Sequence, residues 1–263
     1  MHTKRLVKGF GMAALAMVIP FAASAALAQH EEERHHSDEG QITSDVHKAL
    51  EHKRFANVAA AVHGDEVVLT GSVEDYAAKE QADNRVHHVH GVHGVDNEIQ
   101  VGGPSVEDAI LRDKLARQLS TYRVGYGTNA FNAINLGVHD GVVTISGTVY
   151  GPTDKSDALG IISTTPGVRD VVDDLEVAPL SPMDDELRIR LARAIYGAPT
   201  LQKYAMDPAN PIRITVINGN VTLSGIVDNK ADRDVAGIKA NGVPGVFKVT
   251  NDIQVAGNGR SGM

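Results

Sequence analysis

Four histidines stand close together near the end of a predicted helix, and the neutral imidazole is a common ligand of metal ions. They are His87, His88, His90 and His93. His87 and His90 are three residues apart and share one helical face if the helix continues that far. His93 follows a glycine that should end the helix, so three imidazoles could converge on Zn, Ni or Cu. Further ligands could come from a preceding histidine- and glutamate-rich segment, at His30, His35 and His36.

The same histidines also fit a solvated, titratable helix end. A protonated histidine near a helix C-terminus interacts favourably with the helix dipole. The chain holds two further copies of this unit, and their corresponding stretches contain no histidine. The fold therefore does not require the cluster. Weak binding of a divalent metal and a solvated helix end both remain open, and no other cofactor is expected.

A second group of candidate contact residues is aromatic. The side chains lie in two long segments between a predicted helix and a predicted hairpin: Tyr122, Tyr126, Phe131, Tyr196 and Tyr204. Tyrosine in a loop is suited to a lipid interface or a protein partner, because its ring has an apolar body and a polar tip. The alternative is that these rings close the ends of small cores that contain few other aromatic residues.

The sequence offers little for catalysis. Serine, histidine and carboxylate residues occur without a motif that would join them, and Gly125-Tyr126-Gly127 is too short for a phosphate-binding loop. Cysteine is absent, which excludes disulfides and thiolate sites. The net charge of −8 argues against nucleic acid and against polybasic attraction to anionic lipid. We therefore expect a protein that is not an enzyme.

These residues belong to a unit that occurs three times. Alternating apolar and small polar residues form similar segments at 65–73, 141–149 and 218–229, and each begins at a turn-forming residue, as the second strand of a hairpin does. Gly71, Gly147 and Gly225 occupy one position of this pattern, 76 and 78 residues apart, so the repeat is a whole domain. We expect these glycines to be structural, allowing close helix packing or a bulge.

Helices are predicted on both sides of each hairpin. The first helices show apolar stripes, including Val106, Ile110, Leu111, Leu115 and Leu119 in the second unit. Ser105, with Asp108 three residues later, predicts a capping box, and Ser181 should cap the third unit's helix. After each hairpin a cap residue begins another helix, at Asp75, Gly151 and Asn229. Each unit closes with a glycine helix stop and a strand, at Gly91, Gly167 and Gly245.

The order of elements is therefore α-β-β-α-β. The fold class is α+β, with three tandem small domains, each a three-stranded mixed sheet covered on one face by two helices. The other face of a sheet could pack against a neighbouring repeat. We place the domains at 42–101, 106–177 and 184–255, with linkers at 102–105 and 178–183 and a flexible tail at 256–263.

The N-terminus predicts export. Residues 1–28 have a basic start, an apolar middle and a small-residue ending, as a signal peptide does, and residues 29–41 form a disordered leader rich in His and Glu. A membrane anchor is the alternative, but Pro20 and the small residues favour cleavage. Cleavage would remove three basic residues and leave a net charge of −11. We expect a soluble periplasmic protein without a transmembrane span.

The repeated order of a helix, a "GxVxLxGxV" strand, a helix and a "GVxxVxNxIxV" strand resembles the BON domain of osmotically induced periplasmic proteins of the OsmY type. The resemblance covers about residues 42–255. It implies a non-enzymatic envelope module that binds phospholipid or protein surfaces under osmotic or envelope stress. Two features depart from that family: three domains stand where two are usual, and the turn at residues 63–66 carries extra charge.

These observations lead to a ranked set of functions. The first is a periplasmic binding protein that contacts the phospholipid surface or envelope proteins, its domains acting through summed weak contacts. The alternatives are a periplasmic holdase chaperone that uses exposed apolar sheet faces and a protein that binds divalent metal through its histidines.

Overall fold

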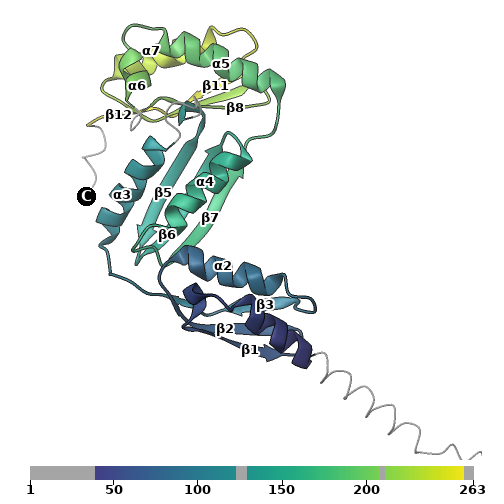
Figure 1. Ribbon diagram of the computed structural model, residues 1–263. Helices are drawn as coiled ribbons and strands as arrows, with labels where there is room; N and C mark the ends of the chain where they lie inside the picture. Colours follow the sequence, from purple (N-terminus) through teal and green to yellow (C-terminus); the bar gives the residue numbers. More distant parts are fainter. Residues whose placement is uncertain (1–38, 123–128, 208–210, 258–263) are drawn as a thin grey trace, which may run out of the picture.

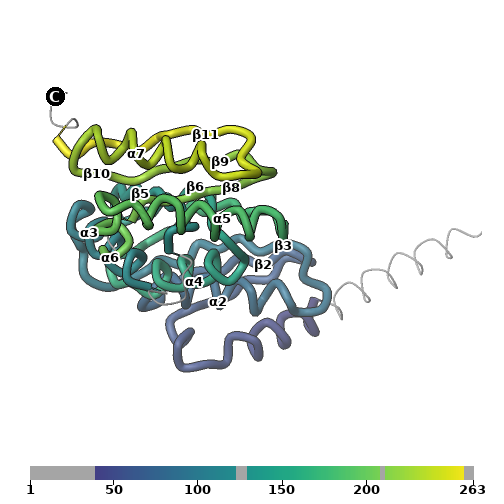
Figure 2. The backbone as a smooth tube through the Cα atoms, turned by 90° about the horizontal axis from the view of Figure 1, so that it is seen from above, coloured from purple at the N-terminus to yellow at the C-terminus, as the bar shows by residue number. Residues whose placement is uncertain are grey.

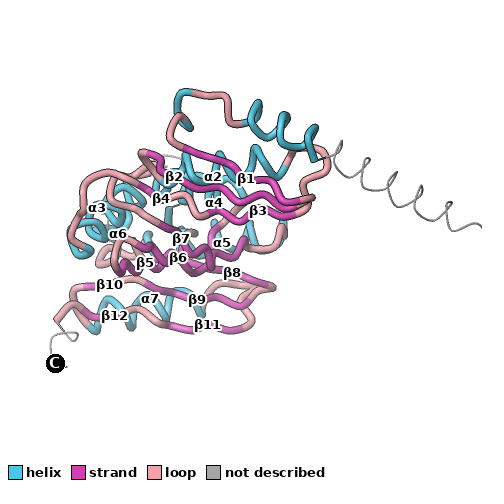
Figure 3. Tube along the Cα trace, turned by 90° about the horizontal axis from the view of Figure 1, so that it is seen from below, coloured by secondary structure: helices cyan, strands magenta, loops and turns pink. Residues whose placement is uncertain are grey.

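The computed structural model describes residues 39–122, 129–207 and 211–257, and three α+β domains follow one another along them (Figure 1). Each domain has a small mixed sheet with helices packed on one face, and Figure 3 shows the helices and strands of all three. The predicted fold class and the threefold repeat are confirmed.

The first domain contains a helix that is described over residues 39–49, so residues 39–41 are helical and not part of a disordered leader. The elements that follow are η1 (Lys53–Phe55), β1 (Val58–His63), β2 (Glu66–Val73), α2 (Tyr76–His87), β3 (Gly94–Asn97) and β4 (Gln100–Val101). Strand β2 is central. It pairs antiparallel with β1 and parallel with β3 and β4.

The second and third domains repeat this plan. The second contains α3 (Asp108–Thr121), η2 (Asn129–Phe131), β5 (Ala133–His139), β6 (Val142–Val149), α4 (Pro152–Ser163) and β7 (Asp170–Val177). The third contains α5 (Pro182–Tyr196), α6 (Gln202–Met206), β8 (Arg213–Ile217), β9 (Asn220–Ser224), β10 (Ile226–Val227), α7 (Lys230–Asn241), β11 (Lys248–Asn251) and β12 (Gln254–Val255). The hairpin strand is again central, between an antiparallel and a parallel neighbour.

Most of the predicted helix starts are confirmed. Asp75 and Asn229 cap α2 and α7 through their side chains, Gly151 precedes α4, and Ser181 caps α5. The capping box at Ser105 is wrong, because α3 begins after Glu107 and has no side-chain cap. Two other details also differ. Ile110 is exposed rather than buried on α3, and the predicted helix-stop glycines lie three residues beyond the C-caps, in the turn that leads to the last strand.

An acidic side chain on the first helix of each domain holds the hairpin turn. Asp184 accepts hydrogen bonds from the amides of Asn218 and Gly219, at 2.8 and 2.9 Å. Asp108 does the same for the corresponding turn of the second domain, at 2.8 and 3.0 Å, and these bonds lower the pKa of its carboxyl. In the first domain, Glu39 accepts one bond from Gly64. The helix and the hairpin are thus fastened together at one end of each domain.

The repeated glycines allow strand backbones to approach one another. Gly71, Gly147 and Gly225 all have positive φ, between 109° and 124°. A Cβ at Gly147 would lie 2.1 Å from the carbonyl oxygen of Ala133 on the neighbouring strand, and the first domain has the same geometry at Gly71. The close neighbour of Gly147 is therefore strand backbone. Close helix packing, one of the two reasons that the sequence analysis gave for these glycines, is not what the structure shows.

The domains pack against one another through aromatic side chains. Tyr76, at the start of α2, is part of the core of the second domain. Phe131 of the second domain packs on the core of the third, and its ring centroid lies 5.8 Å from that of Tyr150. The Tyr150 ring also lies beneath the Arg188 guanidinium of α5, at 5.1 Å. Seen from above, β8 consequently lies close to β5 (Figure 2).

Candidate binding surfaces

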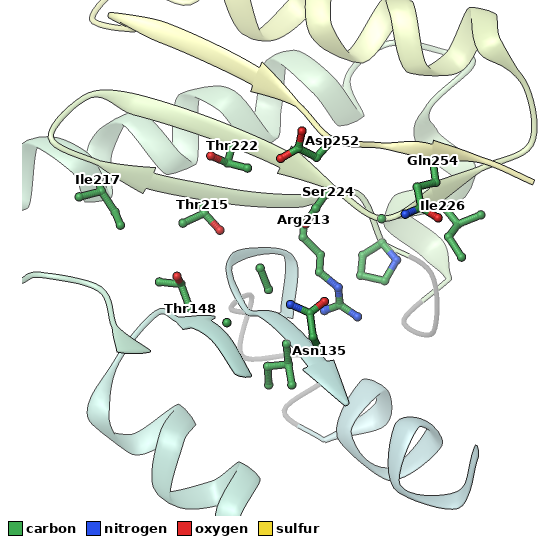
Figure 4. Close-up of a pocket in the computed structure, with 15 residues that line it drawn as sticks. Asn135, Thr148, Arg213, Thr215, Ile217, Thr222, Ser224, Ile226, Asp252 and Gln254 are labelled. Atoms are coloured by element: carbon green, nitrogen blue, oxygen red, sulfur yellow. The ribbon is translucent and has the colours of Figure 1, made fainter. Parts of the chain in front are cut away.

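A groove of about 670 Å³ lies between the second and third domains (Figure 4). One wall is the sheet face of the third domain that no helix covers, where alternate residues of β8 and β9 point away from the core. The other wall is formed by the start of β5 and the end of β6. The groove follows from the strand period of two, which sends every second side chain to the uncovered face.

Hydroxyl and amide side chains dominate the groove. They are Asn135, Thr148, Thr215, Thr222, Ser224 and Gln254. All of these groups can donate and accept hydrogen bonds, and no aromatic side chain of the described residues lines the groove. The surface is thus suited to a polar ligand that carries both donors and acceptors.

Arg213 is the cationic residue of the groove. Its Nη1 donates to the carbonyl oxygen of Asn132 in the second domain, at 2.7 Å. Burial lowers the pKa of its guanidinium, although the nearby Tyr196 acts in the opposite direction. Within the described part of the chain, no carboxylate lies within salt-bridge distance of Arg213. The sequence analysis missed this residue, since a single arginine in a strand carries no motif.

The predicted histidine cluster does not converge. His87 faces Asp83 at 3.8 Å, the Nδ1 of His88 lies 2.6 Å from the Asn84 carbonyl, and His93 faces Asp65 at 3.3 Å. These three imidazoles thus have separate partners, two of them on α2 and one in the turn between β1 and β2, and His90 lies in the turn that follows α2. His30, His35 and His36 lie outside the described residues.

A different group brings metal-ligand atoms together. Across the described ranges, Asp108, His139 and Asp140 place one ligand atom each within 4.8 Å of one another. The Asp108 carboxylate already accepts two turn amides, and the side chains of His139 and Asp140 are about nine-tenths exposed. The hydrogen bonds of Asp108 to the hairpin turn therefore explain why these three side chains lie close together, without a metal ion.

Most of the predicted aromatic contact residues pack inside the molecule. Tyr204 is buried, and its hydroxyl donates to Asp232 at 2.7 Å. Tyr196 donates to the Ile212 carbonyl at 2.6 Å, and Phe131 fills the interface between two domains. Tyr204 thus belongs to an aliphatic core, and Tyr196 and Phe131 are partly buried against it, so packing accounts for all three rings and partner contact by them stays a prediction. Tyr122 is partly exposed, and Tyr126 lies outside the described residues.

The partners of Tyr204 give a pH-dependent prediction. Burial alone would raise the pKa of Asp232, but hydrogen bonds from Lys203 and Tyr204 and the charge of Lys203 lower it. Ionised Asp232 therefore stabilises the third domain above its ordinary pKa of 3.8, and this contribution is lost as the pH falls through the lower, folded-state pKa. We expect Asp232→Asn to destabilise the third domain at pH 7 and to reduce its acid sensitivity. Urea unfolding at pH 7 and pH 3, followed by circular dichroism, measures both effects.

The matched control is Asp234→Asn. Asp234 lies on the same helix and pairs with Lys230 in an exposed position, so its change should leave both unfolding curves within about 0.5 kcal/mol of the unaltered chain. Equal losses from the two substitutions would contradict the role given to Asp232.

Large exposed apolar side chains gather at one end of the third domain. Leu180, Met183 and Phe247 are 90%, 80% and 83% exposed. Met183 precedes Asp184, which holds the turn at Gly219, and the amide of Phe247 donates to the Gly219 carbonyl at 2.9 Å. Phe247 thus lies at the tip of this hairpin, and Leu180 and Met183 lie at the start of α5, which Asp184 bonds to the same turn; we call these three residues the apolar end. The sequence analysis did not single them out.

Comparison with known proteins agrees with this architecture. The BON domain family matches residues 38–103, 107–179 and 200–257, and the chain therefore belongs to the BON domain family. Among individual relatives, it is a distant homologue of the osmotically-inducible protein Y of Escherichia coli strain K12. The two are 25% identical over 193 residues, which cover 72% of this chain and 92% of the relative.

A likeness to solved structures was also found. The C-terminal domain of CdsD, the structural protein of the type III secretion system of Chlamydia trachomatis, aligns with 81% of this chain and 96% of its own length. The sequence identity is 15% and the TM-score is 0.23. In the described part of our chain, no helix has the length and apolar character needed to cross a membrane.

Proposed function

We propose that this chain is a non-enzymatic binding protein of the periplasm that contacts phospholipid surfaces through the apolar end of its third domain, under osmotic or envelope stress. The observation that carries the proposal is the exposure of three large apolar side chains, Leu180, Met183 and Phe247, on segments joined to one hairpin turn by Asp184 and by the Phe247 amide. Membership of the BON family, the osmotic induction named for the relative and the signal-like N-terminus support the setting.

The contact is expected to be mainly apolar. Two cationic residues lie near the apolar end. Lys248 follows Phe247 in the chain, and Arg190 is paired with Glu186 at 3.4 Å, so its charge is already balanced. The chain as a whole is acidic, so it is not attracted to anionic lipid over long distances. Binding should therefore change little between low and moderate salt and should not require an anionic headgroup.

Three side chains give a modest free energy. Burying one such side chain completely stabilises a complex by about 1.5–3 kcal/mol, and the loss of translational and rotational freedom on association costs at least about 4 kcal/mol. Contact through one apolar end is therefore weak and reversible. It is suited to a protein that samples a surface rather than one that is anchored there.

Vesicle flotation tests the proposal. The exported chain, from Gln29 onward, should float with zwitterionic vesicles and with vesicles that contain anionic phospholipid. Changing Leu180, Met183 and Phe247 together to serine should reduce the bound fraction about tenfold or more, because the apolar contact is lost. The matched control changes Met206 and Ile238 to serine, since both are exposed apolar residues at other places on the third domain.

Two results would count against membrane contact. If the unaltered chain does not float with any vesicle, the proposal passes to protein partners in the envelope. If the control variant loses as much binding as the triple variant, exposed apolar residues anywhere on the third domain contribute to vesicle binding, and the apolar end has no special role.

A further inference from the structure

We infer that the groove between the second and third domains binds an extended, carboxylate-bearing peptide segment, with Arg213 holding the carboxylate. The inference concerns a different surface from the apolar end and does not depend on membrane contact. It rests on the shape of the groove, the chemistry of its lining and the position of one partly buried cation.

The shape suits an extended chain. The wall of the groove that belongs to the third domain runs along β8. The five residues of β8 span about 17 Å at about 3.3 Å per residue. An extended peptide of about five residues has the same length and would lie along the uncovered sheet face. The cavity volume of about 670 Å³ has room for such a segment.

The lining also suits a peptide backbone. Each peptide unit presents one donor and one acceptor, and both must find partners when they leave water. Thr215, Thr222 and Ser224 project hydroxyl groups from the wall formed by the third domain, while Asn135 adds an amide from the opposite wall (Figure 4). A nucleic acid fits less well, because the lining formed by the described residues offers no aromatic ring for a base and a single cation for phosphates.

The sheet does not require an arginine at position 213. Its position opposite Ser224 corresponds to Ala59 opposite Thr70 in the first domain and to Asn135 opposite Ser146 in the second. The two other domains thus form the same sheet without an arginine. Bonding to the Asn132 carbonyl uses one of five guanidinium N–H donors, and a partly buried cation is stabilised more by an anion than by a carbonyl.

The groove also has a direction. Asp252 lines it on the far side of Ser224 from Arg213, about two strand spacings away, or roughly 10 Å. A peptide carboxylate would be attracted to Arg213 and repelled by Asp252. Because Arg213 is the first residue of β8 and reaches toward Asn135 (Figure 4), we expect the acidic end of a segment that lies along β8 to be at the start of that strand.

Fluorescence anisotropy with labelled peptides tests the inference. The probes are an eight-residue peptide of glycine, serine, alanine and aspartate with a free C-terminus, and its neutral partner with asparagine and an amidated end. The exported chain should bind the acidic peptide with a Kd of about 10–100 µM and the neutral one about tenfold more weakly. Arg213→Gln should abolish that preference between the two peptides.

A second variant separates binding from domain packing, since Arg213 also joins two domains. Thr222→Trp fills the groove and leaves the Arg213–Asn132 hydrogen bond in place. It should weaken peptide binding about tenfold or more. The matched control is Thr144→Trp, at the equivalent position of the second domain's sheet and outside the groove, which should change binding less than about twofold.

Three outcomes would overturn the inference. One is the absence of binding by either peptide at millimolar concentration. Another is an equal loss of binding in Thr222→Trp and Thr144→Trp. The third is displacement of the acidic peptide by inorganic phosphate at equal concentration, which would make the groove a general anion site and not a peptide site.

Discussion

Substituting Gly147 with alanine is expected to unfold the second domain at temperatures at which the unaltered chain is folded. Gly147 has φ 115°, a conformation that costs a residue with a Cβ about 1–3 kcal/mol. The added Cβ would lie 2.1 Å from the Ala133 carbonyl oxygen, and this neighbour is strand backbone that cannot rotate away. We expect a total cost of at least about 3 kcal/mol, against about 4–10 kcal/mol for a domain of this size.

The experiment combines thermal unfolding with hydrogen exchange. Circular dichroism should show an early transition, and exchange in peptides from β5, β6 and β7 should show that the second domain is the one that opens. Gly137→Ala is the matched control, because Gly137 lies on the adjacent strand and its Cβ would meet nothing closer than 4.0 Å. Equal melting of the two variants would show that backbone approach at Gly147 is not what stabilises the hairpin.

The sequence allowed the positions of such glycines to be predicted because they recur at one point of a repeated strand pattern. Their cause could not be predicted. Helix packing and a bulge both place a glycine in a strand, and only coordinates show that the Ala133 carbonyl occupies the space of the missing side chain. In the same way, the order of elements predicted a mixed sheet, but not the register at which β7 pairs with β6.

The candidate site residues were less predictable, for two physical reasons. The spacing of His87 and His90 predicts a shared face only while a helix continues, and α2 ends at His87. Tyr196 and Tyr204 lie in long segments, as interface residues often do, yet small aliphatic cores take up available rings, and both hydroxyls find partners inside the domain. An amphipathic side chain does not reveal from sequence which environment it occupies.

The residues that sequence reasoning missed are the ones whose role depends on neighbours far along the chain. Met183 and Phe247 are separated by more than sixty residues and meet at one hairpin because Asp184 and Phe247 both bond the same turn. Arg213 becomes unusual only when the strand registers of the three domains are aligned. A comparison of the three repeats by strand register could have identified Arg213 before any coordinates were available.

Replacing Arg188 with alanine should have the second large effect, because this buried side chain joins the third domain to the second. Its Nη2 donates to the Val216 carbonyl at 2.6 Å, its Nη1 pairs with Asp185 at 2.5 Å, and its guanidinium covers the Tyr150 ring. Alanine would leave the Val216 carbonyl without this donor and uncover the face of the Tyr150 ring that the guanidinium packs on. We expect a loss of about 3 kcal/mol from the third domain.

The same change should separate two unfolding transitions that the interface couples. The second and third domains share Phe131, Tyr150 and Arg188, so the unfolding of one exposes apolar surface on the other. Calorimetry of Arg188→Ala should resolve an early transition for the third domain. Arg190→Ala, which removes an exposed arginine two residues along α5, should cost less than about 0.5 kcal/mol.

A double variant decides whether the coupling passes through the aromatic ring. Tyr150→Ala removes the contact from the other side, so the two changes should together cost less than the sum of their separate effects. Strict additivity would mean that Arg188 stabilises only its own domain and that the two domains unfold independently. Coupled domains would hold both walls of the groove in one arrangement, which is the condition for a ligand to contact β5 and β8 at the same time.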